Sequence, residues 1–166
     1  MNYVKIKPVD VSNGEGIRVS LFVTGCTHHC KGCFNAELWN HNAGEKFTPD
    51  TTMDILYQLS KPYISGLSLL GGEPLDPKNV SDLAVLCHAV KKRFPNKDIW
   101  CYTGYDWEQV KQLFIMNYID VLVDGQFMQD LADPRLKFRG SSNQRIIMVK
   151  PSLESGRVVV RKDLME

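Results

Sequence analysis

The 166-residue sequence has no excess of charge of either sign, because 20 Lys and Arg residues are matched by 19 Asp and Glu residues. A net charge of +1 gives no electrostatic basis for binding nucleic acid or an anionic membrane. No run of about 18 apolar residues is present, and the N-terminal stretch has charges and glycines where a signal peptide needs an apolar core. These absences predict a cytoplasmic protein with no membrane or nucleic-acid partner.

Cysteine is scarce, and its count of five is odd. An odd number without an export signal argues against a disulfide framework and for reduced thiols that bind metal or fill the core. Cys26, Cys30 and Cys33 lie within "CTHHCKGC", which contains no fourth cysteine. Cys87 lies on the apolar stripe of a predicted helix and Cys101 lies in a predicted strand, so we interpret both as core residues.

Three clustered cysteines are too few for a closed tetrahedral zinc site unless His28 or His29 completes it. Both histidines lie in the gap between Cys26 and Cys30, and we interpret them as exposed loop residues. A 4Fe-4S cluster normally takes one thiolate per iron, so three cysteines leave one iron open to a small molecule. The spacing favours such a cluster. A zinc-binding interaction module and a ferredoxin-like carrier, which needs a fourth protein ligand, are the alternatives.

Apolar stretches separated by helical patterns predict an α/β fold. Strands are predicted over 17–24, 66–70, 98–104 and 119–125. Helices are predicted over 48–60, 79–94 and 106–114. This alternation implies parallel strands with right-handed crossovers, in an open sheet or a partial barrel. Further along, two more strands are expected over 144–150 and 157–161, joined by a turn over 151–156.

Four short motifs directly follow predicted strands. They are the cysteine loop, "GGEP" at 71–74, "TGY" at 103–105 and "VDG" at 123–125. Because the carboxyl ends of parallel strands meet at one edge of a sheet, we expect the four loops to share one site.

The stretch "CTHHCKGCF" resembles the CxxxCxxC signature of radical S-adenosylmethionine enzymes, and "GGEP" resembles their second signature. The resemblance implies the family's partial (βα) barrel of mostly parallel strands. It also implies a 4Fe-4S cluster on Cys26, Cys30 and Cys33, with S-adenosylmethionine chelating the open iron. In such enzymes, reductive cleavage of the cofactor gives a 5′-deoxyadenosyl radical, which removes a hydrogen atom from the substrate.

The same resemblance implies which residues border the cofactor. The set comprises Gly32, Cys33 and Phe34 beside the adenine, Gly71 and Gly72 along the methionine moiety, Glu73 near its amino group, and Thr103 with Gly104 at the ribose or methionine. Glycines lack a Cβ, which would let main-chain polar groups approach the cofactor closely. Plain turns are the alternative at 71–74 and 103–104.

Several further segments resemble glycyl-radical activating enzymes, and among them the activating proteins of anaerobic ribonucleotide reductases. These are "VSNGEGIRVSLFVTGC", "NKDIWCYTGY", "VLVDGQF" and "FRGSSNQR". The resemblance implies a glycyl-radical-generating oxidoreductase. Its implied partners are the reductase's large subunit, which presents the glycine, and a low-potential electron donor such as flavodoxin. A pyruvate formate-lyase type activase and a radical enzyme acting on a small molecule, such as a deazapurine synthase, are the alternatives.

The likeness runs through most of residues 1–149. We therefore expect an activase domain over 1–150 and a C-terminal extension over 151–166, to which the sequence assigns no role. A basic cluster lies near the end of the expected domain, formed by Arg135, Lys137, Arg139 and Arg145. It either steers a partner or forms a solvated basic face.

Overall fold

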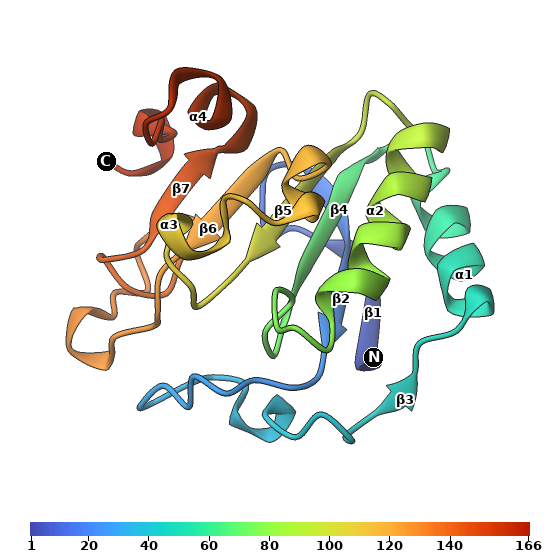
Figure 1. Cartoon of the computed structure of the whole chain (residues 1–166), viewed down its shortest axis with the longest axis horizontal. Coiled ribbons are helices and arrows are strands. Elements are labelled where there is room, and N and C mark those ends of the chain that lie inside the picture. Colours follow the sequence, from blue (N-terminus) through green and yellow to red (C-terminus); the bar gives the residue numbers. More distant parts are fainter.

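The structure is a computed structural model that describes all of residues 1–166. It is built on one seven-stranded sheet with the order β3-β1-β2-β4-β5-β6-β7 (Figure 1). The strands are β1 (Asn2–Asp10), β2 (Ile17–Val23), β3 (Glu45–Lys46), β4 (Ile64–Gly71), β5 (Asp98–Tyr102), β6 (Val121–Asp124) and β7 (Arg145–Met148). The α-helices are α1 (Pro49–Leu59), α2 (Val80–Arg93), α3 (Trp107–Val110) and α4 (Val149–Ser155). The 3-10 helices are η1 (Ala36–Leu38), η2 (Phe114–Asn117), η3 (Gln129–Leu131) and η4 (Lys162–Leu164).

The middle of the sheet is parallel, as the sequence predicts, and its edges are not. β2, β4, β5 and β6 run parallel to one another. β1 is antiparallel to both β2 and β3, and β7 is antiparallel to β6. The α/β class is therefore confirmed, as an open mixed sheet that ends at β3 and β7.

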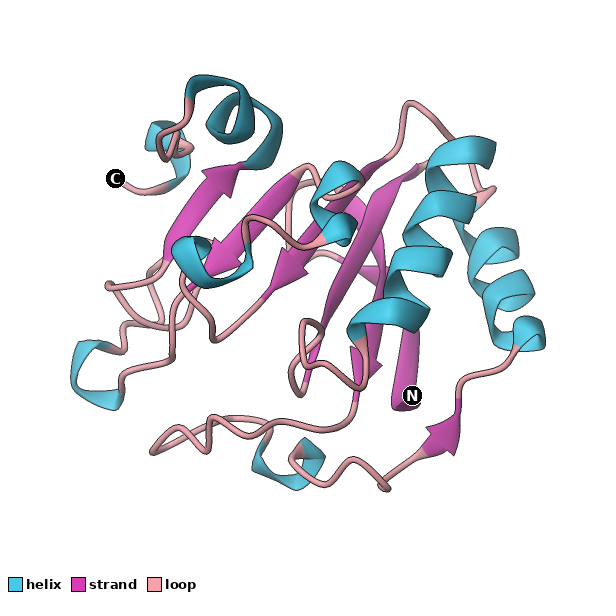
Figure 2. Ribbon diagram, in the orientation of Figure 1, coloured by secondary structure: helices cyan, strands magenta, loops and turns pink.

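The two faces of the sheet have different coverings. α1 and α2 lie against one face, over the larger core cluster (Figure 2). Because side chains alternate along a strand, Ile99 and Cys101 of β5 enter this cluster. Trp100 points to the other face and joins a smaller cluster with Val121, Val123, Ile146 and Leu164. None of the helices combines the length and the apolar composition that a membrane span requires.

α1 and α2 lie close to the ranges predicted for them, whereas the elements later in the chain depart further from their predicted ranges. The helix predicted over 106–114 ends at Val110, and Leu113 is already extended before η2 begins. The predicted turn over 151–156 is instead the end of α4, which Gly156 closes with a left-handed backbone. The strand predicted over 157–161 is wrong, because that segment forms only one isolated bridge, from Val160 to Ile147.

Candidate functional site

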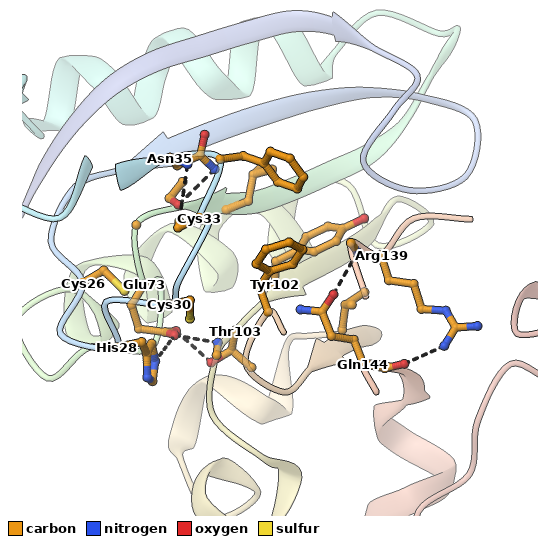
Figure 3. A pocket seen from close by; sticks show the side chains of 18 of the residues that line it. Cys26, His28, Cys30, Cys33, Asn35, Glu73, Tyr102, Thr103, Arg139 and Gln144 are labelled. Carbon is orange, nitrogen blue, oxygen red and sulfur yellow. Dashed lines mark hydrogen bonds and ion pairs between the residues drawn. The ribbon is translucent and has the colours of Figure 1, made fainter. Parts of the chain in front are cut away.

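The loops after β2, β4, β5 and β6 meet around a cavity of about 370 Å³ (Figure 3). This confirms that the four motifs share one edge of the sheet. Most of the residues predicted for the site line the cavity: Cys26, Cys30, Cys33, Phe34, Gly71, Gly72, Glu73, Thr103 and Gly104. Gly32 lies on the exposed side of the cysteine loop and is not part of the lining.

The five cysteines fall into two groups. Cys26, Cys30 and Cys33 are partly exposed at the cavity, whereas Cys87 and Cys101 are fully buried in the larger core cluster, which confirms their interpretation as core residues. Burial raises the pKa of Cys26 to about 11 and also raises that of Cys30. Free thiols of this kind are protonated at neutral pH and become good ligands only when a metal displaces the proton.

The cysteine loop fits an iron-sulfur cluster better than one metal ion. No group of three or more His, Cys, Asp or Glu side chains converges as a single ion requires. In a 4Fe-4S cluster each thiolate binds a different iron, so the sulfurs need not converge on one point. The main-chain N–H of Asn35 also donates to Cys33 Sγ over 3.4 Å, the type of hydrogen bond that tunes such clusters.

Neither histidine of the loop is free to complete a zinc site. His28 Nε2 lies 2.7 Å from Glu73 Oε2, and its Nδ1 lies 3.2 Å from Gln126 Nε2. The His29 ring is stacked on Trp39 at a centroid distance of 4.3 Å. The interpretation of His28 as an exposed loop residue is wrong, since its side chain is only 10% exposed.

Glu73 is the polar centre of the site. Its side chain is 2% exposed and accepts four hydrogen bonds of 2.7 to 2.9 Å. The donors are His28 Nε2, the Thr103 hydroxyl and the main-chain N–H groups of Leu75 and Gly104. A carboxylate offers about four acceptor positions, so all of them are occupied. Glu73 therefore ties together the loops that follow β2, β4 and β5.

The glycines of "GGEP" pack directly against the start of the cysteine loop. Gly72 N–H donates to Val23 O at 2.8 Å, and Glu73 N–H donates to Gly25 O at 2.7 Å. A Cβ on Gly72 would lie only 2.6 Å from Gly25 O, and one on Gly71 would lie 2.5 Å from Val23 O. The chain needs glycine at these positions to bring the turn and the cysteine loop together, whatever binds in front of them.

The structure adds residues that the sequence did not single out. Tyr102 and Phe127 line the cavity, and the Phe34 ring packs on Phe127 at a centroid distance of 5.1 Å. Asn35 Nδ2 donates to Gly71 O over 3.4 Å. These aromatic and amide side chains have no distinguishing sequence pattern, because their partners are distant along the chain.

The predicted basic cluster is largely neutralised or tied into the fold. Arg145 pairs with Asp124 at 2.5 Å, and Arg135 pairs with Asp133 at 3.0 Å. Arg139 lines the cavity, and its guanidinium donates to Gln144 O at 2.8 Å. The structure therefore gives these residues mainly internal partners.

Comparison with known proteins agrees with this geometry. Residues 12–147 match the family model for 4Fe-4S single cluster domains. The chain is 49% identical over 146 residues to the anaerobic ribonucleoside-triphosphate reductase-activating protein of Enterobacteria phage T4, covering 88% of this chain and 93% of that protein. Proteins of the same name are 47% identical over 150 residues in Haemophilus influenzae (88% and 97% covered) and 46% identical over 148 residues in Escherichia coli K12 (87% and 96% covered).

Proposed function

Because the chain belongs to the family of anaerobic ribonucleoside-triphosphate reductase-activating proteins, we propose that it activates such a reductase by generating a glycyl radical on the reductase's large subunit. It is an oxidoreductase whose cofactors are a 4Fe-4S cluster and S-adenosylmethionine. When bound, these cofactors supply reductive cleavage of S-adenosylmethionine and a radical able to abstract the glycine Cα hydrogen.

Three residues of this chain would hold the cluster: Cys26, Cys30 and Cys33. They share one loop and line one cavity in which no fourth cysteine takes part, and this observation carries the proposal. The Gly71–Glu73 turn lies on the same cavity. Its main chain and the exposed ring of Phe34 are the surfaces available for S-adenosylmethionine, with Gly32 at the outer side of the loop.

Glu73 and Thr103 would act mainly by shaping this surface. The Thr103 hydroxyl donates to Glu73 Oε1 at 2.8 Å and accepts from Tyr105 N–H at 3.1 Å, so it is already engaged. No Lys or Arg lies within ion-pair distance of Glu73. A buried carboxylate without a cationic partner favours a cationic ligand, and S-adenosylmethionine carries both a sulfonium and an ammonium group.

The finer features of the proposal follow from the same family relationship. Residues 1–150 would form an activase domain with the partial barrel of radical S-adenosylmethionine enzymes. Electrons would come from a low-potential donor such as flavodoxin, in the cytoplasm. A protein substrate can itself enclose part of the site, which suits a cavity whose lining includes the 76% exposed Phe34.

The decisive experiment is electron paramagnetic resonance of a mixture with a cognate anaerobic reductase. With S-adenosylmethionine, a low-potential reductant and no oxygen, we expect a glycine-centred doublet on the reductase. Replacing the reductase's C-terminal loop glycine with alanine should remove the doublet. A competent reductase that acquires no radical, while the protein modifies a small molecule such as a purine, would contradict the proposal.

A further inference from the structure

His28 lies in the cysteine loop and contacts the loops that follow the other three parallel strands, β4, β5 and β6. Its Nε2 binds Glu73, after β4, at 2.7 Å, and its Nδ1 binds Gln126, after β6, at 3.2 Å. The ring edge meets the Tyr105 ring, after β5, at a centroid distance of 4.6 Å. A single side chain therefore connects the loop that carries the cysteines to the three neighbouring loops. Figure 3 shows its contact with Glu73.

The direction of these hydrogen bonds follows from the chemistry of the groups. An amide nitrogen only donates, so Gln126 donates and Nδ1 of His28 accepts. With Nδ1 as the acceptor, Nε2 is the nitrogen that donates to Glu73. The histidine thus satisfies one acceptor position of the buried carboxylate.

Gly104 lies directly against the imidazole. A Cβ built on Gly104 would come within 2.6 Å of His28 Cδ2, although the Gly104 backbone itself has an ordinary φ. The main-chain N–H of Gly104 donates to Glu73 Oε2 at 2.8 Å, the same oxygen that His28 binds. Glycine at 104 is therefore explained by the space that His28 needs.

We infer that His28 is a positioning residue, which fixes the cysteine loop relative to the Gly71–Glu73 turn and so aligns the cluster site with the S-adenosylmethionine site. The inference rests on the proposed function, in which these two segments hold the two cofactors. Cys26 and Cys30 flank His28 in sequence, so the contacts of His28 hold the loop between two of the expected cluster ligands. Groups that orient metal ligands in this way commonly contribute about 10-fold or more to affinity or activity.

The first test compares two matched substitutions, His28→Asn and His29→Asn. Asparagine tolerates the left-handed backbone of His29, whose φ is 51°, so the control introduces no backbone strain there. We expect His28→Asn to retain cluster iron but to bind S-adenosylmethionine about 10-fold more weakly. The change that the cofactor causes in the paramagnetic spectrum of the reduced cluster should shrink in parallel. His29→Asn should match the wild type in both measurements.

His28→Gln provides a rescue, because its longer side chain places an amide N–H near the position of Nε2. It should recover most of the affinity that His28→Asn loses. A loss of the same size in both His28 variants would overturn the inference, since it would show that the hydrogen bond to Glu73 is not what matters.

Gly104→Ala tests the same role of His28 by crowding its imidazole ring. The added methyl should displace the imidazole and weaken S-adenosylmethionine binding in the wild-type background, and should add little in His28→Asn, where the ring is gone. Fully additive effects would contradict the inference.

Hydrogen exchange on the protein without its cluster separates this inference from the proposed function. His28→Asn should accelerate exchange of the amides in the cysteine loop, residues 25–35, whether or not the protein is an activase. If the wild type fails to bind S-adenosylmethionine, the proposed function is wrong. The exchange rates of the loop amides still test whether His28 holds the cysteine loop in place. If both loop exchange and cofactor affinity of His28→Asn equal those of the wild type, the inference is wrong.

Discussion

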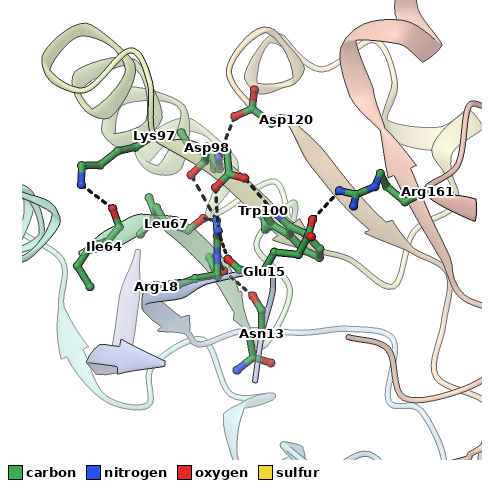
Figure 4. A network of polar contacts seen from close by, with 12 residues as sticks. Asn13, Glu15, Arg18, Ile64, Leu67, Lys97, Asp98, Trp100, Asp120 and Arg161 are labelled. Carbon is green, nitrogen blue, oxygen red and sulfur yellow. Dashed lines mark hydrogen bonds and ion pairs between the residues drawn. The ribbon is translucent and has the colours of Figure 1, made fainter. Parts of the chain in front are cut away.

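Glu73 and Arg18 are buried charged residues at opposite ends of the parallel strands, and they are held by different kinds of partner. At the carboxyl ends, Glu73 accepts hydrogen bonds from groups in three loops. At the amino ends, Arg18 is fully buried between strands. Its Nη1 pairs with Asp98 Oδ1 at 2.8 Å and its Nε donates to Ser68 Oγ at 2.7 Å (Figure 4).

Further contacts of Arg18 also run to neighbouring strands. Its Nη2 donates to Leu67 O at 2.9 Å, and the guanidinium lies 5.5 Å from the centre of the Trp100 ring. Arg18 therefore joins β2 to β4 and β5, which are rigid elements of the core. Glu73 joins side-chain and main-chain groups of three loops. The difference suggests that one end of the sheet determines stability and the other determines the geometry of the site.

The largest expected effect is on activity at the carboxyl end. Cys30→Ala should abolish S-adenosylmethionine cleavage, because a cluster with two protein ligands is not retained, and iron analysis should show the loss. The unfolding free energy of the cluster-free protein should hardly change, since Cys30 is only partly buried. Cys87→Ala, in the core, is the control and should keep its cluster and its cleavage activity. A Cys30→Ala protein with full cleavage activity would refute the ligand assignment.

The second effect is on stability at the amino end. Arg18→Met removes the buried cation and leaves its acceptors without donors, which should lower the unfolding free energy by about 3 kcal/mol. Urea unfolding of the cluster-free protein measures this. The folded fraction should bind S-adenosylmethionine with wild-type affinity. Weakened binding in fully folded Arg18→Met protein would show that the two ends are not independent.

Glu73→Gln should affect both properties, with the larger consequence for the site. The amide keeps the shape of the side chain, but its NH₂ group faces two donors and the negative charge is lost. Stability should fall by about 1 to 3 kcal/mol. Titration calorimetry should show cofactor affinity reduced by about 10-fold, in line with the loss of a positioning partner. Unchanged affinity would mean that Glu73 serves only the fold.

Gly72→Ala tests what the glycine turn is for. Its Cβ would press on Gly25 O, so the cysteine loop should shift and cluster iron should decrease together with cofactor affinity. Overpacking of this kind typically costs about 1 to 3 kcal/mol. If iron content stayed normal while only cofactor affinity fell, the glycine would be serving the cofactor and not the loop.

The smallest effect is expected for Arg161→Ala. Arg161 pairs with Glu15 at 2.5 Å and with Asp163 at 2.8 Å, but both carboxylates are largely exposed. Exposed pairs contribute about 0 to 1 kcal/mol, so urea unfolding should detect little change. A loss comparable with that of Arg18→Met would show that the ion pairs of Arg161 contribute more than exposed pairs usually do.

Sequence patterns predicted the structural features that depend on residues close together in the sequence. Thr48 and Pro49 mark the start of α1, and the apolar strands predict the parallel centre of the sheet. From that order alone, the four loops had to meet at one edge. The antiparallel edges were missed, because no strand was predicted over β1 and because the direction of β7 depends on the long loop that separates it from β6.

The same limit applies to the site. The spacing of the cysteines indicates a cluster, but His28 and Glu73 are 45 residues apart and no local pattern connects them. The glycines of "GGEP" are recognisable, whereas their contact with Gly25 is visible only in the folded chain. A local sequence motif can identify which residue types form the site. It cannot predict the hydrogen bonds that orient them, because the partners are distant in the sequence.

The segment after α4 also has a consequence for how molecules of this protein meet one another. Met148 N–H donates to Val159 O at 2.8 Å, and Arg161 N–H donates to Ile146 O at 2.8 Å, so the last residues cover the outer side of β7. An uncovered edge strand is a template for strands from other molecules. At the opposite edge, β3 has only two residues and offers little to pair with. A chain shortened before residue 157 would expose the apolar β7 edge and would be expected to self-associate during concentration.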